Sequence, residues 1–245
     1  MSDNPDLIEF IEPFLYEGFV SEVLFQVKSG KEATVFCCRG TRKSRSSYVA
    51  AKVYRPLTGR GFRNDAAYSE GRVMGKRREQ VAFAKKTDFG KRVQHGMWVA
   101  NEYETLRALH SAGADVPRPI ALRGCAILME LAGHDDSPAP PLREHRPSRD
   151  EAQLLFRRVM GNIERFLSCN VVHSDLSPYN VLYWNGHIRI IDFPQAVDPR
   201  FNSNARMFLG RDIENLASYF ERFGVECRPW KIATDLWNRF RYSEL

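Results

Sequence analysis

The sequence predicts an α+β protein whose amino-terminal half is rich in strands and whose carboxy-terminal half is mainly helical. Short runs of β-branched and aromatic residues cluster between residues 22 and 54, whereas apolar residues at helical spacing dominate after residue 148. The composition, with 43% hydrophobic and 27% charged residues among 245, is that of a soluble globular chain. It excludes a disordered tail, a collagen-like rod and a small disulfide-stabilised domain.

Three strands are predicted near the start of the chain. The runs EVLFQVK at 22–28 and ATVFCCR at 33–39 flank Ser29 and Gly30, a pattern typical of a hairpin with a glycine turn. The run YVAAKVY at 48–54 has the same composition and predicts the third strand.

A polar segment at about 55–97 follows these strands. It contains six glycines and shows no strong periodicity, so we expect a mobile insert. Apolar residues then recur at helical spacing over 98–112 and predict a helix that ends at Gly113. Two further strands are predicted at 120–123 and 125–131.

The second half begins with four prolines in residues 134–149, which predict a linker. The sequence Ser148–Glu151 resembles a capping box and opens a helix that we expect to run to about residue 168. Two more helical patterns lie within 211–242 and are separated near Gly224.

The positive charge of the chain is concentrated in one segment. The net charge is +6, but residues 41–100 alone carry 15 Lys and Arg against 4 Asp and Glu. Nucleic acid, ribosomal RNA or the phosphates of a nucleotide would each complement such a segment, and a solvated segment without a partner is an equal alternative. No base-reading motif is present, so sequence-specific DNA binding is not predicted.

Other features place the protein in the cytoplasm and away from membranes. The five cysteines are odd in number and include no C-x-x-C pair, which predicts buried thiols in a reducing compartment. No apolar run approaches the roughly 20 residues that span a bilayer. The first residues are acidic, unlike those of a signal peptide.

Lys52 is the first candidate for a role in catalysis or binding, because it lies within the apolar run Ala50–Tyr54. A lysine is costly to bury unless it is paired. An anionic ligand would supply a partner, and so would Glu102 on the predicted helix at 98–112. A lysine that points to water is the plain alternative.

A polar loop and a second acidic residue complete the constellation. The loop between two apolar runs has the spacing H-x-D-x-x-x-x-N, with His173, Asp175 and Asn180. Asp192 ends the next apolar run, and the turn Asn185-Gly186 predicts a hairpin that folds Asn180 and Asp192 toward each other.

These residue types match the needs of phosphoryl transfer. Asn180 and Asp192 offer the oxygen ligands that Mg²⁺ prefers. Asp175 is suited to orient an acceptor hydroxyl and take its proton, and Lys52 is suited to hold nucleotide phosphates.

With this set, the sequence resembles the protein-kinase fold and, within it, the RIO family of atypical protein kinases over about residues 20–225. The resemblance implies a two-lobed kinase-like fold without an activation loop: an N-terminal extension at 1–20, an N-lobe at 21–132 and a C-lobe at 133–245. The motifs that carry it are Ser29–Ala33, Ala51–Tyr54, Trp98 with Glu102 and Leu106, Val116–Ile120, His173–Leu182, Asp192, and Phe208-Leu209 with Arg211, Asp212 and Asn215.

The resemblance also assigns roles to individual residues. It implies that Lys52 binds the α- and β-phosphates and pairs with Glu102, that Asp175 is the catalytic base, and that Asn180 and Asp192 bind the metal. It further implies a phosphate loop and an adenine site, formed by Ser29, Lys31, Met129, the backbone carbonyl of Glu130 and the backbone N–H of Ala132. Some family members are thought to form a phosphoaspartate, which here would be at Asp192.

The implied activity is ATP- and Mg²⁺-dependent phosphorylation of protein serine or threonine, including autophosphorylation, or ATP hydrolysis, with Mn²⁺ as an alternative metal. The resemblance further implies a role in ribosome maturation, with ribosomal RNA or a pre-ribosomal particle as partner. Two alternatives stay open: a nucleotide-gated RNA- or ribosome-binding assembly factor, and a small-molecule phosphotransferase.

Several departures from ordinary protein kinases fit the RIO pattern. Ser174 replaces the usual arginine, Pro194 replaces the usual glycine, and no A-P-E motif follows. The few residues before the first strand favour the first RIO branch, whereas Asp192–Gln195 looks more like the second.

Overall fold

A computed structural model describes residues 5–55, 88–134 and 136–245. Within these ranges the chain forms two compact units. The first comprises residues 5–55, 88–107 and 117–139, and the second comprises residues 108–116 and 140–245. The predicted lobe boundary after residue 132 stays a prediction.

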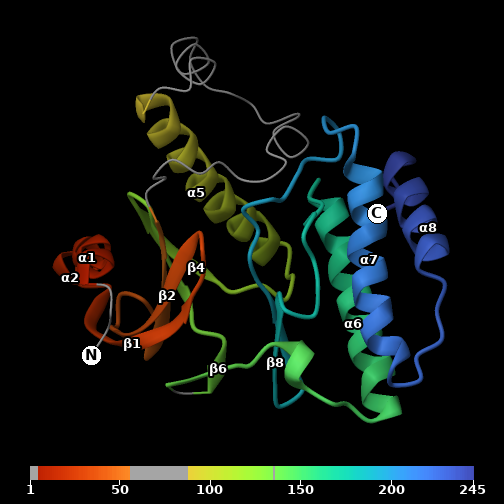
Figure 1. Cartoon of the computed structure of the whole chain (residues 1–245), viewed down its shortest axis with the longest axis horizontal. Coiled ribbons are helices and arrows are strands. Elements are labelled where there is room, and N and C mark those ends of the chain that lie inside the picture. Colours follow the sequence, from red (N-terminus) through yellow and green to blue (C-terminus); the bar gives the residue numbers. More distant parts are fainter. Residues whose placement is uncertain (1–4, 56–87, 135) are drawn as a thin grey trace. The chain divides into compact units, whose positions relative to one another are not determined.

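The first unit is built on a five-stranded antiparallel sheet with the strand order β1-β2-β3-β5-β4 (Figure 1). All five predicted strands are confirmed, with ends shifted by at most two residues. Their bounds are β1 Val20–Ser29, β2 Ala33–Gly40, β3 Tyr48–Tyr54, β4 Pro119–Arg123 and β5 Ala126–Glu130.

Both faces of β3 are covered, which explains its continuous apolar run. On one face, Val49, Ala51 and Val53 share a core with the short amino-terminal helices, α1 Pro5–Ile8, η1 Glu9–Ile11 and α2 Glu12–Tyr16. The sequence assigned residues 1–20 only to an extension, yet Ile11 and Phe14 are fully buried there. Side chains alternate along a strand, so Lys52 and Tyr54 point to the opposite face, where they contact α5.

Helix α5 spans Asp88–Ser111, so it begins ten residues before the predicted start at 98. The expected insert at 55–97 is therefore wrong for residues 88–97, and residues 56–87 lie outside the described ranges. Gly90 and Gly96 in this stretch disfavour a helix, so the sequence underestimated its length, whereas extending a helix that is already packed costs little.

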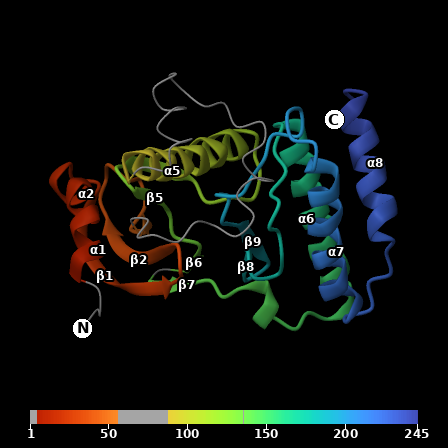
Figure 2. The same cartoon turned by 45° about the horizontal axis from the view of Figure 1, so that its top comes forward.

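The second unit contains three helices that lie side by side (Figure 2), α6 Arg149–Ser168, α7 Ala205–Glu221 and α8 Pro229–Arg241. A Cβ at Gly210 would lie 2.2 Å from the ring of Trp230, so α7 and α8 approach as closely as they do only with glycine at this position. The two helices predicted within 211–242 are confirmed, although α7 begins at Ala205.

The predicted start of α6 is confirmed, because the Ser148 side chain accepts the Glu151 N–H at 3.3 Å. The Glu151 carboxylate instead accepts the Tyr183 hydroxyl and lies 3.0 Å from His145 Nε2. The boundary between the two units falls within the predicted linker at 134–149, which also contains short elements held by local backbone hydrogen bonds. Its elements are β6 Gly133–His134, β7 Ser137–Pro138 and η2 Leu142–Glu144.

The predicted turn at Asn185-Gly186 lies in a β-hairpin. Strands β8 Val181–Trp184 and β9 His187–Ile190 pair around Asn185 and Gly186, whose φ angles of 45° and 78° are those of a type I′ turn. Residues 191–204 then connect β9 directly to α7.

The five cysteines are free; Cys37 and Cys38 are fully buried, as predicted, whereas Cys125, Cys169 and Cys227 are only partly buried. Burial raises the pKa of Cys37 to about 11 and that of Cys38 to about 12, which keeps both thiols protonated. Among the described residues, none of the helices combines the length and the hydropathy needed to cross a membrane.

Candidate active site

The first unit places Lys52 in an ion pair with Glu102. Lys52 on β3 is 9% exposed and Glu102 on α5 is 1% exposed, and Lys52 Nζ lies 2.7 Å from Glu102 Oε1. Removing either partner would leave a buried charge, so the two residues depend on each other. The pair predicted from the sequence therefore forms, and burial excludes a lysine that points to water.

Tyr54 is a third member of this group, and its contact with Glu102 was not predicted from the sequence. Its hydroxyl donates to the second oxygen of Glu102, and Lys52 Nζ lies 5.0 Å from the centre of its ring. Tyr54 lies two residues after Lys52 on the same strand face, which was the available signal. Both carboxylate oxygens of Glu102 are thus engaged, and the orientation of Lys52 is fixed.

The predicted phosphate loop is a tight turn between β1 and β2. The Gly30 N–H donates to the Ala33 carbonyl at 2.8 Å, while Ser29 and Lys31 are exposed. Arg55, which the sequence did not single out, donates to Ser29 Oγ at 2.7 Å and adds a cation beside the turn.

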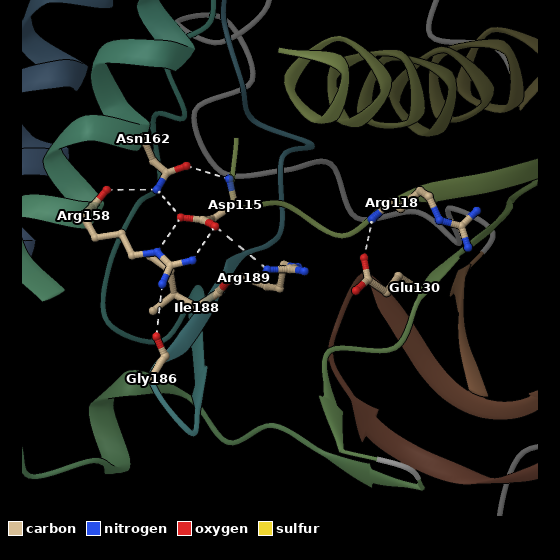
Figure 3. Close-up of polar contacts among 8 residues, drawn as sticks. All are labelled: Asp115, Arg118, Glu130, Arg158, Asn162, Gly186, Ile188 and Arg189. Atoms are coloured by element: carbon tan, nitrogen blue, oxygen red, sulfur yellow. Dashed lines mark hydrogen bonds and ion pairs between the residues drawn. The ribbon is translucent and has the colours of Figure 1, made fainter. Parts of the chain in front are cut away.

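The predicted adenine-binding residues lie at the end of β5. Met129 and Ala132 are buried. Glu130 is bonded twice to Arg118. Its N–H donates to the Arg118 carbonyl at 2.9 Å. Its carboxylate accepts the Arg118 N–H at 3.1 Å, the contact drawn in Figure 3. These bonds fix the backbone at Glu130, while the role in adenine binding stays a prediction.

In the second unit, the loop that contains Asp175 is held from α7. The buried Asp212 carboxylate accepts the N–H groups of Ser174 at 2.8 Å and Leu176 at 2.9 Å. Asn215 Nδ2 donates to the Leu176 carbonyl at 3.0 Å. Two residues that flank Asp175 are therefore fixed, and Ser174 is held at a φ of 70°, which is unfavourable for a residue other than glycine.

We expect Asp212→Ala to lower the free energy of unfolding by roughly 2–4 kcal/mol, because two buried N–H groups would lose their acceptor. Urea denaturation measures the loss. Asp235→Ala, which removes an exposed acid from α8, is the matched control and should change stability by less than about 0.5 kcal/mol. Equal stability of the two variants would show that Asp212 does not hold the loop.

The pH dependence of stability offers a second test of Asp212. Burial raises its pKa from 3.8 to about 7, although the two bound N–H groups and Arg211 act in the opposite direction. Between these values the folded state keeps a proton that the unfolded chain has lost. The contribution of Asp212 is therefore full below about pH 4 and is lost as the pH rises toward 7. Urea titrations across this range should show that slope, and a variant with Asp212→Asn that kept it would contradict the assignment.

Asp175 and Asn180 are joined by a hydrogen bond within the loop. Asn180 is buried, and its Nδ2 donates to the Asp175 carbonyl at 2.8 Å, which leaves its Oδ1 facing the other way. The Asp175 side chain is exposed. Partial desolvation, followed by the negative charge of Asp192, raises the pKa of Asp175, while Arg211 opposes this. The two carboxylates are thus close enough to repel each other.

The β8–β9 hairpin places Asp192 beside this loop, as predicted. The Ile191 N–H donates to the Asn180 carbonyl at 2.9 Å, so Asn180 and Ile191 are opposite each other just beyond the paired strands. His173 Nε2 lies 3.1 Å from the Ile191 carbonyl, and its ring packs on buried Phe193. Asp192 has a φ of 75°, a second strained position in the same loop system.

The predicted site residues thus fall into two groups, each assembled within its own unit. Lys52 and Glu102 belong to the first unit. Asp175, Asn180 and Asp192 belong to the second.

Comparison with known proteins identifies the family. The family model described as RIO domain matches residues 34–232. The RIO-type serine/threonine-protein kinase Rio1 of Haloferax volcanii is 33% identical over 216 residues, which cover 88% of this chain and 69% of that protein. The serine/threonine-protein kinase RIO1 of Caenorhabditis elegans is 30% identical over 202 residues, which cover 81% of this chain but only 37% of that protein. The chain thus spans well under half the length of some relatives.

Solved structures show the same fold. The Rio2 kinase–ADP/Mg²⁺–phosphoaspartate complex from Chaetomium thermophilum matches with a TM-score of 0.67 and 22% identity, covering 93% of this chain and 64% of that one. The Rio2 kinase structure from the same organism matches with a TM-score of 0.65 and 20% identity, covering 92% and 66%. This likeness confirms the predicted kinase-like fold, with strands concentrated in the amino-terminal part and helices in the carboxy-terminal part. The chain therefore belongs to the RIO-domain family of atypical protein kinases.

Proposed function

We propose that this protein uses ATP and Mg²⁺ to transfer the γ-phosphoryl group to serine or threonine side chains of proteins, including its own, or to water. The observation that carries the proposal is the loop system of the second unit. There Asp175, Asn180 and Asp192 are held together by Asn180 Nδ2, which bonds the Asp175 carbonyl, and by the Ile191 N–H, which bonds Asn180. Strain at both Ser174 and Asp192 supports a functional reason for this conformation.

The donor atoms of Asn180 and Asp192 fit Mg²⁺. The Asn180 Nδ2 bond to the Asp175 carbonyl leaves Oδ1, a hard oxygen donor, for the metal. Mg²⁺ usually takes only one or two protein ligands and completes its shell with water and substrate phosphates. The bound ion would neutralise charge on the phosphates.

Asp175 would act on the acceptor. Its exposed carboxylate would accept the proton of the attacking hydroxyl while the new oxygen–phosphorus bond forms and the bond between the γ-phosphorus and the bridging oxygen breaks, which releases ADP. Lys52, oriented by Glu102 and Tyr54, would hold the α- and β-phosphates. The roles of Ser29, Lys31, Met129, Glu130 and Ala132 toward the nucleotide are part of the same proposal.

The structural neighbour described as an ADP/Mg²⁺-phosphoaspartate complex supports one refinement. We extend it to this chain by proposing Asp192 as the acid that would carry the phosphoryl group. Hydrolysis of such a phosphoaspartate gives free phosphate, whereas direct transfer through Asp175 gives labelled protein. Which product dominates decides between an ATPase and a protein kinase.

A second candidate function is that of a nucleotide-gated factor that binds ribosomal RNA or a pre-ribosomal particle. It is favoured by the turn between β2 and β3, where Arg42, Lys43 and Arg45 are exposed. Ser44 in the same turn is fully buried and bonded to Thr41 and Ser46, which fixes the shape of the turn.

Cytoplasmic placement belongs to the same proposal and is supported by the five free cysteines.

Incubation with γ-labelled ATP, with and without ribosomal particles, tests both candidates. We expect Mg²⁺-dependent release of free phosphate or labelling of protein by the chain alone. Absence of both products under all conditions would contradict the enzymatic proposal. Binding of the protein to ribosomal particles that weakens as the salt concentration rises would support the second candidate. Binding that does not depend on the salt concentration would contradict a role for the basic turn.

A further inference from the structure

Asp115 is the centre of the most connected polar cluster in Figure 3, and nothing in the sequence pointed to it. It lies between α5 and β4, and its side chain is 20% exposed. The carboxylate accepts Arg158 Nε and Nη2, both at 2.8 Å, in the bidentate geometry that gives strong ion pairs. Asn162 Nδ2 donates to it at 2.8 Å.

Asn162 on α6 also fixes the backbone of Asp115. Its side chain is almost fully buried, and its Oδ1 accepts the Asp115 N–H at 2.7 Å. Its Nδ2 donates to the Arg158 carbonyl as well as to Asp115, so all of its polar atoms are engaged. The Asn162 side-chain amide thus contacts both the carboxylate and the backbone N–H of Asp115. The short side chain of an aspartate allows both contacts at once. The direction of the Asp115 carbonyl is consequently set by α6.

That carbonyl accepts the N–H of Ile190, the last residue of β9, at 2.7 Å. The next N–H along the chain, that of Ile191, donates in the opposite direction to the Asn180 carbonyl. The strand end is therefore held from both sides, by Asp115 on its outer edge and by Asn180 on its inner edge. Asp192 follows immediately, in a left-handed conformation that persists only if its surroundings fix it.

The same cluster also contacts the other end of the hairpin. Arg158 Nη1 donates to the Gly186 carbonyl at 3.0 Å, in the turn between β8 and β9. Arg189 on β9 lies 3.9 Å from the Asp115 carboxylate. Asp115 and its partners on α6 thus secure the hairpin at its turn, in its middle and at the end that leads to Asp192.

We propose that Asp115 is a positioning residue that sets the place of Asp192 by fixing the N–H of Ile190, and so determines how tightly the site holds a divalent metal with nucleotide. The inference rests on the proposed function, in which Asp192 is a metal ligand. Partners that orient a metal ligand through hydrogen bonds typically contribute about 10- to 100-fold to metal affinity.

Two isosteric variants test this inference. Asp115→Asn places an amide against the Arg158 guanidinium and removes the bidentate ion pair. Glu164→Gln is the matched control, because Glu164 also lies on α6 and also pairs with an arginine, but that arginine is Arg239 of α8 and not a residue that binds the hairpin. The first measurement is the Mg²⁺ concentration that gives half-maximal binding of N-methylanthraniloyl-ATP. The second is amide hydrogen exchange of residues 188–193 without nucleotide.

We expect Asp115→Asn to raise the half-maximal Mg²⁺ concentration about tenfold and to speed exchange at 188–193 several-fold, while binding of the nucleotide without metal is unchanged. Glu164→Gln should change none of these. Equal values for Asp115→Asn and the parent, or equal changes in both variants, would overturn the inference. If the parent itself bound no nucleotide with Mg²⁺, the proposed function would fail. Unchanged hydrogen exchange at residues 188–193 in Asp115→Asn would separately overturn the positioning role of Asp115.

Discussion

Asp175→Asn should lower the rate of ATP turnover by about 10²- to 10⁴-fold while binding of Mg²⁺ and ATP stays within about twofold of the parent. The amide has nearly the same shape as the carboxylate but cannot accept the proton of an attacking hydroxyl. The backbone carbonyl that receives Asn180 Nδ2, and the N–H that faces His173 at 3.4 Å, are retained. The loop should therefore keep its conformation, and only the proton transfer should fail.

Release of free phosphate and labelling of protein from γ-labelled ATP together measure this effect, with nucleotide binding followed by calorimetry in the same preparation. Glu144→Gln is a suitable control, since Glu144 is an exposed acid of η2 in the same unit and should retain full turnover. Parental turnover in Asp175→Asn would remove Asp175 from the role of base. Loss of nucleotide binding together with turnover would instead assign it to the binding of ATP.

Asp192→Asn should raise the Mg²⁺ concentration needed for nucleotide binding by about 100-fold or more, because a carboxylate that contacts the metal is at least as important as the groups that orient it. Asparagine tolerates a left-handed backbone well, so the φ of 75° at this position adds little strain to the variant. The change therefore removes the charge without disturbing the hairpin.

Calorimetric titration of ATP with and without Mg²⁺ measures the loss. Binding without metal should be unaffected, which separates a metal ligand from a general structural role. The same variant should lower the pKa of Asp175, because the charge of Asp192 is one cause of its raised value. A normal Mg²⁺ dependence in Asp192→Asn would contradict the metal assignment.

Sequence patterns predicted those features that depend on local spacing. Alternation and β-branched residues located all five strands, and Asn185-Gly186 specified the hairpin that joins Asn180 to Asp192. The pairing of Lys52 with Glu102 was also predictable, because a buried lysine needs an acid and the next helix offers one on its apolar side.

Features that depend on distant backbone groups were not predictable in the same way. Asp212 binds N–H groups 36 and 38 residues away, and Asp115 receives the Ile190 N–H across 75 residues of chain. Backbone donors are not visible in the side-chain pattern, so the resemblance marked Asp212 as part of a motif without revealing its contacts, and Asp115 looked like a surface residue. The early start of α5 was not predicted, because Gly90 and Gly96 disfavour a helix, whereas extending a helix that is already packed costs little.

The central claim is that Asp175 and Asp192 act together on one phosphoryl group. The turnover of a variant that carries both Asp175→Asn and Asp192→Asn, compared with each single variant at saturating ATP and Mg²⁺, tests it most directly. Residues that act as one catalytic unit give strongly non-additive losses. We predict that the double variant is no slower than the slower single variant within about threefold. A double variant whose loss equals the product of the two single losses would contradict the claim.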